Sequence, residues 1–451
     1  MPALLWSAAY FLLILTSYYI LRPIRDEMGV VGGVENLAWL FTGTLVGMLL
    51  LHPLFTSLVT RFPRRKFIPL IYRFFIANLV VFFLLFRGAS DAQSVWIGRV
   101  FFIWVSVFNL FVVSVFWSFM TDVYRPDQSK RLFGVLAVGG TIGAILGASI
   151  TSVFVSALGP INLLLVSAVF LELACRAARM LDKQEERLAT EAAIERVEGG
   201  AVAGAAPVAP AATAMPRNQG EDVIGGRTLD GVRDVLRSSY LLGIAGLMLF
   251  FTISSTFLYF QQAAITREVF GDDSESRTRF FANIELLVNS LTLLTQLFIT
   301  GRLMRWLGVG ASLAFLPLIS VLGFGVLAVA PVLTALVALQ VVRRAGNFAI
   351  QRPAREVLYT VLSRTDKYKS KNFNDTFVYR VGDQIGAWSS TALTWMGLGI
   401  AGVSLTMVPF CAIWLGLALW LGVRYRRIQE GAAAAMPRGG RAASPEVVQG
   451  A

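Results

Sequence analysis

Two rows of polar side chains at helical spacing carry the chemistry that this sequence offers. Offsets of three and four residues place the members of a row on one face of a helix. The first row is Glu285, Asn289, Thr292 and Gln296, and the second is Gln340, Arg344, Asn347, Gln351 and Arg355. The planar guanidinium of arginine suits two-point binding of a carboxylate or a phosphate. The rows therefore predict a polar cavity that binds an anion.

Two shorter charged sets extend this predicted site. Arg22, Arg25 and Asp26 lie near the end of the first long apolar stretch of the chain. Arg380 and Asp383 open a stretch close to the carboxyl terminus. Charged groups inside a membrane helix are costly and usually face a cavity or a partner. We therefore include all five residues among the candidate substrate-binding residues.

Each set also has an alternative interpretation that needs no ligand. Polar side chains in membranes often join neighbouring helices by hydrogen bonds, which accounts for Asn289 equally well. Arg22 can extend to the lipid headgroups. Arg344 can be neutralised by an acid such as Asp383, and Asp383 can instead pair with Arg380 three residues earlier.

Twelve long apolar stretches must position these residues. Each has the ~17–25 residues that a helix needs to cross a bilayer. They span 5–28, 35–59, 67–87, 95–120, 133–157, 160–180, 238–264, 278–300, 308–330, 331–352, 376–398 and 400–423. The composition agrees, with 56% hydrophobic residues and a mean hydropathy of +0.65. Because lipid cannot hydrogen-bond a bare backbone, the sequence predicts an all-α integral membrane protein.

Basic residues are concentrated in alternate loops. Lys and Arg follow the even-numbered stretches, whereas the turns after the fifth, ninth and eleventh contain none. The positive-inside rule then places both termini and the even-numbered loops in the cytoplasm, for a protein of the inner (plasma) membrane. The net charge of +12 is thus explained by topology, which argues against a nucleic-acid partner.

The chain divides into two halves of six stretches each. Residues 1–180 form the first half and 238–430 the second. Between them, residues 181–237 are charged and then rich in Ala, Gly and Pro, a composition that cannot bury a core and predicts a flexible cytoplasmic linker. Residues 431–451 are similarly biased and predict a disordered cytoplasmic tail.

No set of catalytic or metal-binding residues is present in the sequence. The chain has one His and two Cys, and these two cysteines, Cys175 and Cys411, lie far apart in different apolar stretches. There is no phosphate-binding glycine loop and no nucleophile–base set. We therefore expect a protein without metal or cofactor that moves a small molecule and leaves it unchanged. We also expect it to be a monomer.

Two six-helix halves joined by a cytoplasmic linker resemble the layout of major-facilitator transporters, whose halves face one central site. The loop TRFPRR at 60–65 is similar to the basic turn of that superfamily, with Thr60 in place of its acid and Pro63 in place of its glycine. The resemblance implies a twelve-helix major-facilitator-type bundle.

Several segments resemble the ATP/ADP translocase (nucleotide transporter) family of plastids and intracellular bacteria. They are YILRPIRD at 19–26, FWSF at 116–119, KRLFG at 130–134, VGGTIG at 138–143, RPAREVLY at 352–359 and KYKSK at 367–371. This resemblance implies exchange of ATP for ADP, with Arg25 and Arg355 contacting phosphates. The sequence departs from the family in having arginines where the family has lysines at both positions. Val105 stands about where the family has an acidic residue.

The sequence thus favours a transporter that exchanges an anionic metabolite by alternating access, with a nucleotide as the substrate that the resemblance implies. One alternative is a proton-coupled exporter of an unrelated small molecule, in which Glu285 or Asp26 carries the proton. Another is a membrane sensor or scaffold that transports nothing, although the linker and tail contain no recognisable partner domain.

Overall fold

Helices make up the regular structure of the residues that the computed structural model describes, which are 2–61, 64–124, 126–202, 238–362, 370–371 and 373–435. The first half contains six long helices. They are α1 (Pro2–Val31), α2 (Leu37–Arg61), α3 (Arg64–Gly88), α4 (Asp91–Val123), α5 (Pro126–Leu158) and α6 (Leu163–Val202), with a short 3-10 turn η1 (Val34–Asn36) before α2. Each covers one of the apolar stretches predicted from the sequence.

The second half is less regular. Its elements are α8 (Ser239–Phe270), α9 (Ser274–Phe298), α10 (Thr300–Val329), α11 (Leu333–Gly346), η2 (Asn347–Gln351), α12 (Arg352–Leu358), η3 (Tyr359–Val361), η4 (Asn374–Val378), α14 (Tyr379–Trp395) and α15 (Ile400–Ala435). The run α11–η2–α12 takes the place of the tenth predicted span. Its middle element, η2, is a π-helical turn just before Pro353, where proline removes a backbone donor from the helix.

All twelve predicted spans are therefore helical, in an all-α bundle without strands among the described residues. Within this described part, nine helices are long and apolar enough to cross a membrane. The other three spans fall in α6, α11 and α14. Helix α6 carries Glu172, Arg176 and Arg179 in its apolar part, whereas α11 and α14 are short.

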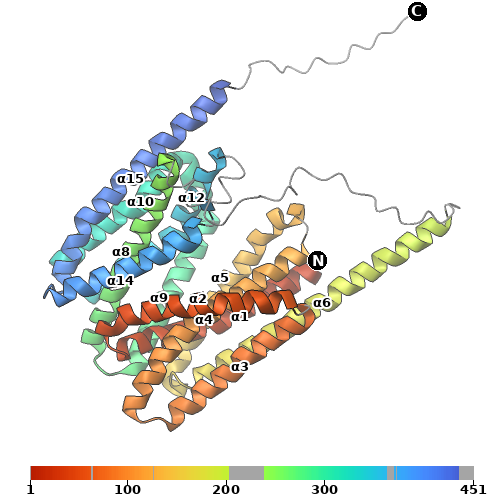
Figure 1. Ribbon diagram of the computed structural model, residues 1–451, viewed down its shortest axis with the longest axis horizontal. Helices are drawn as coiled ribbons and strands as arrows, with labels where there is room; N and C mark the ends of the chain where they lie inside the picture. Colours follow the sequence, from red (N-terminus) through yellow and green to blue (C-terminus); the bar gives the residue numbers. More distant parts are fainter. Residues whose placement is uncertain are drawn as a thin grey trace, which may run out of the picture.

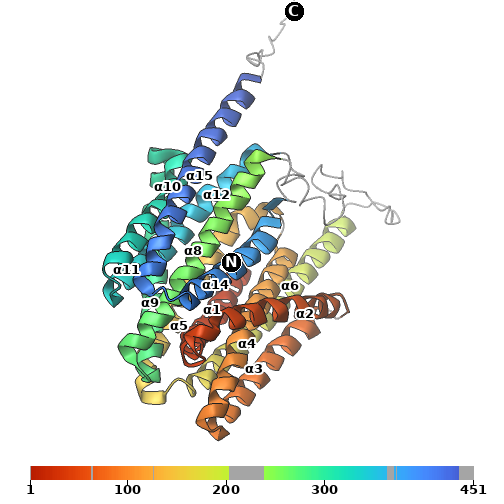
Figure 2. The same cartoon turned by 60° about the vertical axis from the view of Figure 1, so that its left-hand side comes forward.

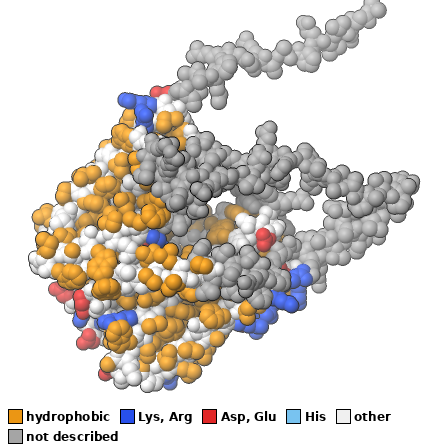
Figure 3. Space-filling model, viewed as in Figure 1, with side chains coloured by type: hydrophobic (Ala, Val, Ile, Leu, Met, Phe, Trp, Pro, Cys, Tyr) orange, Lys and Arg blue, Asp and Glu red, His pale blue; other side chains and the backbone are white. Residues whose placement is uncertain are grey.

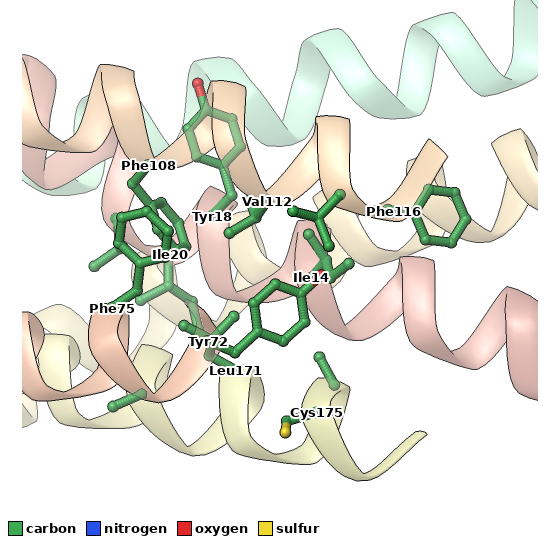
Figure 4. Packing of buried hydrophobic residues seen from close by; sticks show 14 of the residues in the cluster. Ile14, Tyr18, Ile20, Tyr72, Phe75, Phe108, Val112, Phe116, Leu171 and Cys175 are labelled. Carbon is green, nitrogen blue, oxygen red and sulfur yellow. The ribbon is translucent and has the colours of Figure 1, made fainter. Parts of the chain in front are cut away.

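Each half packs around a hydrophobic core of its own. In Figures 1 and 2 the helices coloured red to yellow lie on one side and those coloured green to blue on the other. Helix α1 packs against α4, α5 and α6, and Figure 4 shows Ile14, Tyr72 and Phe108 in this core. Gly143 of α5 lies so close to the α1 backbone that a Cβ there would collide with the Leu12 carbonyl. This close approach fixes the position of α1, which carries Arg22 and Arg25.

The two halves meet near one end of the bundle. We call the end with Pro2, Val202, Ser239 and Ala435 the linker end, and the end with the α1–α2 and α8–α9 turns the far end.

Helices from the two halves pack as the pairs α5–α9, α1–α9, α2–α14 and α1–α8. Toward the far end, Trp39 meets Trp388 edge to face with a centroid separation of 4.9 Å. Close by, Thr42 donates to Gln384 at 2.9 Å. The halves are thus joined at the far end.

Apolar side chains cover much of the outer surface. Figure 3 shows them over most of the described face in view. Large apolar residues such as Leu49, Phe74, Leu84 and Val153 are exposed on the helices. Such a surface suits contact with lipid, because hydrocarbon imposes no cost on exposed apolar groups.

Helical structure extends into the predicted linker. Helix α6 continues to Val202, so the first part of the predicted linker, 181–237, extends the sixth helix. Residues 203–237 lie outside the described residues, as do 62–63, 363–369 and 436–451. The flexible linker and the disordered tail therefore remain predictions there, as does the assignment of the linker end to the cytoplasm.

Candidate functional site

Glu285 of α9 lies at the centre of the charged residues predicted from the sequence. Its side chain is only 2% exposed. Arg344 of α11 grips it in a two-point contact, with Nη1 donating to Oε1 at 2.6 Å and Nη2 to Oε2 at 2.8 Å. Arg22 of α1 approaches from the other half, with its Nε 3.2 Å from Oε1. Two guanidinium groups from opposite halves thus converge on one carboxylate.

The contact of Arg22 is less complete than that of Arg344. Its Nε is close to Glu285 but is not aligned for a hydrogen bond. Among the described residues, its two terminal nitrogens have no hydrogen-bond partner. The side chains of Arg22 and Arg344 are 21% and 19% exposed, so both remain accessible. Arg22 therefore points into the protein rather than toward headgroups, and it retains free donors for a ligand.

A second ion pair lies one turn further along α1. Arg25 donates to the Asp26 carboxylate from Nη2 at 2.6 Å and from Nε at 3.0 Å. The same oxygen of Asp26 accepts a hydrogen bond from Tyr259 of α8 at 3.0 Å. The guanidinium of Arg25 also lies over the ring of Phe102, 4.8 Å from its centroid. Asp26 thus links the two halves directly.

The cluster around Glu285 and the Arg25–Asp26 pair together carry an excess positive charge. Arg22, Arg25 and Arg344 contribute three positive charges, and Asp26 and Glu285 contribute two negative ones. One positive charge is left uncompensated. A charge away from bulk water is costly unless it is paired. A bound anion would supply the missing partner, so this cluster is the candidate binding site.

The remaining candidates on α9 and the α11–η2–α12 run have mixed surroundings. Asn289 donates to the backbone carbonyl of Glu285 at 2.7 Å, within its own helix. Asn347 is half-buried at the start of the π-helical turn. Gln351 ends that turn, and both polar atoms of its buried amide have no partner in the described structure. Arg355 pairs with Asp375 at 3.4 Å.

Two alternative interpretations held that these charged residues pair with one another rather than bind a ligand, and ion pairs of this kind are present. Arg380 contacts Asp383 at 3.3 Å, and Asp383 also accepts a hydrogen bond from Thr256 at 3.5 Å. These two residues thus satisfy each other. Arg344 is paired with an acid as the alternative stated, but the acid is Glu285 rather than Asp383. The Arg344 side chain of that pair is partly exposed and the pair borders Arg22, so it belongs to the candidate site.

Arg343 lies outside this site, although it is the neighbour of Arg344. It is buried and donates to the hydroxyls of Ser320 and Ser254 and to the carbonyl of Phe251. The rings of Phe251 and Trp414 flank its guanidinium. Successive residues of a helix point about 100° apart, so the two arginines face different neighbours.

Sequence reasoning missed the residues that connect the halves. Tyr259 donates a hydrogen bond to Asp26, and Glu27 forms an ion pair with Arg277 at 2.9 Å. Charged residues near the ends of apolar stretches are common, so their position alone did not distinguish them. The neighbouring acids Asp26 and Glu27 were the available signal, since two adjacent carboxylates at this depth need two partners.

Two six-helix halves with charged residues at their interface define a helical membrane transporter. Residues 4–351 match the family model of the Major Facilitator Superfamily, and the chain belongs to this family. It is therefore a transporter of the major-facilitator type rather than an enzyme.

Several solved structures have a similar fold. One is a bacterial homolog of the human lysosomal transporter Spinster in an inward-facing and unoccupied conformation, with 16% identity, coverage of 95% of this chain and 96% of that one, and a TM-score of 0.50. The nucleoside transporter NupG has 13% identity, coverage of 95% and 98%, and a TM-score of 0.50. An auto-inhibited peptide transporter of the POT family has 16% identity, coverage of 94% and 96%, and a TM-score of 0.59.

Identities this low show the fold alone. No curated protein sequence gives a significant match. The narrower resemblance to ATP/ADP translocases remains a prediction.

Proposed function

We propose that this transporter exchanges an anionic metabolite by alternating access, and that the anion binds between Arg22 and Arg344. The observation that carries the proposal is the convergence of these two arginines on Glu285. Alternating access about a fixed site requires ligand contacts from both halves. Arg22 belongs to the first half and Arg344 to the second, which meets this requirement.

Glu285 then acts as an internal substitute for the substrate. A carboxylate offers the same pair of acceptor oxygens that a substrate carboxylate or phosphate presents to a guanidinium. An incoming anion first meets the free terminal nitrogens of Arg22 and then competes for Arg344. With a monovalent anion bound, three negative charges balance three positive ones. A monovalent anion thus leaves the site neutral, which lowers the cost of closing it away from water, whereas a nucleotide, with several negative charges, also requires contact with further basic groups.

We propose nucleotides as the first substrate class to test. The resemblance assigns phosphate contacts to Arg25 and Arg355. Arg25 lies one turn from Arg22, so neighbouring phosphates of one chain can reach both. Arg355 lies eleven residues beyond Arg344, which corresponds to ~16 Å along a helix. It is held by Asp375 nearer the linker end, where it would meet the substrate at a different stage from Arg344.

Proton-coupled export is the second candidate function. It is favoured by the two buried carboxylates, Asp26 and Glu285, at the interface of the halves. A proton carrier must bind and release its proton during each cycle, whereas an anion exchanger needs only its counter-substrate. The two mechanisms therefore differ in what drives uptake.

Counterflow in proteoliposomes tests the proposal. Vesicles that contain the purified protein are loaded with unlabelled ADP, inorganic phosphate or buffer, and uptake of labelled ATP, ADP or phosphate is measured with and without a pH gradient. Exchange predicts uptake that requires an internal anion and proceeds without the gradient. Uptake driven by the pH gradient alone, into vesicles without an internal anion, would favour the proton-coupled candidate.

An arginine far from the site provides the matched control. Arg176 is exposed on α6 and pairs with Glu172. Arg176→Gln should leave counterflow unchanged, whereas Arg22→Gln and Arg344→Gln should reduce it. Equal loss in all three variants would point to a general effect of removing positive charge.

A further inference from the structure

A buried ion pair crosses between the halves at the far end. Glu27 of α1 and Arg277 of α9 approach to 2.9 Å, and their side chains are 0% and 4% exposed. The second terminal nitrogen of Arg277 donates to the carbonyl of Gly271, which follows the end of α8. One arginine thus holds α1, α8 and α9 together at this end.

The pair closes the far end together with apolar residues from both halves. A buried cluster there includes Val30, Leu37, Ala38, Phe260, Ala263 and Phe281. We call Glu27, Arg277 and these six residues the far-end gate. In a transporter that alternates between two openings, these contacts must separate when the site opens to the far side.

The ion pair itself is incompletely satisfied. Oε2 of Glu27 and Nε of Arg277 have no hydrogen-bond partner in the described structure. Removing two charges from water costs about as much as their attraction returns, so a buried pair of this kind gives little net stability. When the gate opens, water can hydrate both groups and replace the lost contact. The pair can therefore separate at small cost, as a reversible closure requires.

Loss of a single partner has a different consequence. It leaves one buried charge without compensation, and this strongly disfavours the closed arrangement. Replacing both partners with apolar residues removes both charges. Opening would then expose apolar side chains to water, so the closed gate is favoured.

We propose that Glu27 and Arg277 are positioning residues of the transport cycle that set the balance between the closed and open far-end gate. They act through α1, because Glu27 lies directly after Arg25 and Asp26 on the helix that also carries Arg22. The movement of α1 that separates Glu27 from Arg277 must also displace these residues of the binding site. This role of Glu27 and Arg277 depends on the family's alternating access and not on the chemical identity of the substrate.

A second ion pair between the halves provides a matched control. Arg267 and Glu35 also join the halves at the far end, at 3.5 Å, but their side chains are 54% and 64% exposed. Exposed pairs of this kind contribute little because water already solvates both groups. Glu35→Gln therefore removes the same charge from the same end without leaving a buried charge.

Thiol labelling of the gate tests the proposal. Ala38→Cys places a reporter in the buried cluster, in a protein whose native Cys175 and Cys411 are replaced by Ala. The labelling rate with a soluble maleimide is measured on purified full-length protein without substrate. Glu27→Gln and Arg277→Gln should each accelerate labelling by at least about tenfold, whereas Glu35→Gln should leave the rate within about twofold of the parent.

Two double variants separate gating from misfolding. The exchange of charges, Glu27→Arg with Arg277→Glu, should return labelling toward the parent rate. The apolar pair, Glu27→Leu with Arg277→Met, should slow labelling below the parent rate, which a loosened protein would not do. The proposal is wrong if the single variants label at the parent rate, or if both double variants label as fast as the single ones. If labelling follows the expected pattern but anion counterflow fails, the proposed substrate class is rejected and the proposed role of Glu27 and Arg277 still stands.

Discussion

The carboxylate of Glu285 accepts hydrogen bonds from both terminal nitrogens of Arg344, at 2.6 and 2.8 Å, while Nε of Arg22 from the opposite half lies 3.2 Å away. Within the described part of the chain, the terminal nitrogens of Arg22 have no hydrogen-bond partner. This arrangement resembles a ligand already bound, with a protein side chain in the place of the ligand. It explains how an arginine pair can persist at the interface before substrate arrives. It also predicts competition between Glu285 and the transported anion.

The first prediction concerns the two arginines that hold Glu285. Arg22→Gln and Arg344→Gln should each weaken anion binding by about 10–150-fold, because a charge-assisted hydrogen bond contributes ~1.5–3 kcal/mol. Lysine keeps the charge but loses the planar fork, so Arg344→Lys should cost less than Arg344→Gln if charge dominates. Equilibrium binding of labelled anion to purified protein measures both effects. Unchanged affinity in both Gln variants would remove these arginines from the site.

The second prediction separates two neighbouring arginines. Arg343 contacts only neutral groups among the described residues, in the core between α8, α10 and α15. Arg343→Gln should therefore leave anion affinity within about twofold, whereas Arg344→Gln should reduce it at least about tenfold. The same binding assay compares them, with thermal unfolding as a check on folding. A larger loss of affinity for Arg343→Gln than for Arg344→Gln would contradict the placement of the site.

The third prediction tests the nucleotide as substrate. If phosphates contact Arg25 and Arg355, then replacing either residue with Gln should weaken binding of ATP and ADP. The loss should be smaller for inorganic phosphate, which cannot reach both arginines at once. Competition of unlabelled phosphate against labelled ATP measures the difference. If both substitutions leave nucleotide affinity unchanged, the nucleotide proposal fails while the anion site at Arg22 and Arg344 can still stand.

The fourth prediction fixes the orientation in the membrane. The alternating basic loops place the linker near Gly200 and the loop Lys367–Lys371 in the cytoplasm. Residues 367–369 of that loop lie outside the described structure. Single cysteines at these places should react with impermeant reagents only after the cells are opened, whereas a cysteine in the α8–α9 turn should react in intact cells. Labelling of the linker in intact cells would reverse the orientation of the protein in the membrane.

The helices of this bundle were predictable because the length and polarity of an apolar stretch are local properties. The same holds for the rows that contain Glu285 and Arg344, since helical spacing alone places their members on one face. The pairing of these two residues was not predicted, because it depends on how α9 and α11 pack. The separation of Arg343 from Arg344 was equally inaccessible.

Residues near helix ends were the hardest to interpret from sequence. Charges at Glu27 and Arg277 are what any chain displays where it leaves the membrane, and only the tertiary structure brings them together across the halves. The linker boundary shows the opposite case. Residues 181–202 have a charged composition that cannot bury a core, yet they continue α6, because Ala, Glu, Leu, Lys and Arg are strong helix formers and a helix already formed is extended at little cost.

The central claim is that the transported anion takes the place of the Glu285 carboxylate, and equilibrium binding to Glu285→Gln tests it most directly. The anion identified by counterflow is titrated into the parent protein and this variant, with Arg176→Gln as the control. Removal of the internal competitor predicts tighter binding, by about tenfold if one charge-assisted contact is freed, and exchange that persists. Weaker binding, or loss of transport together with uptake driven by a pH gradient alone in the parent protein, would contradict the account.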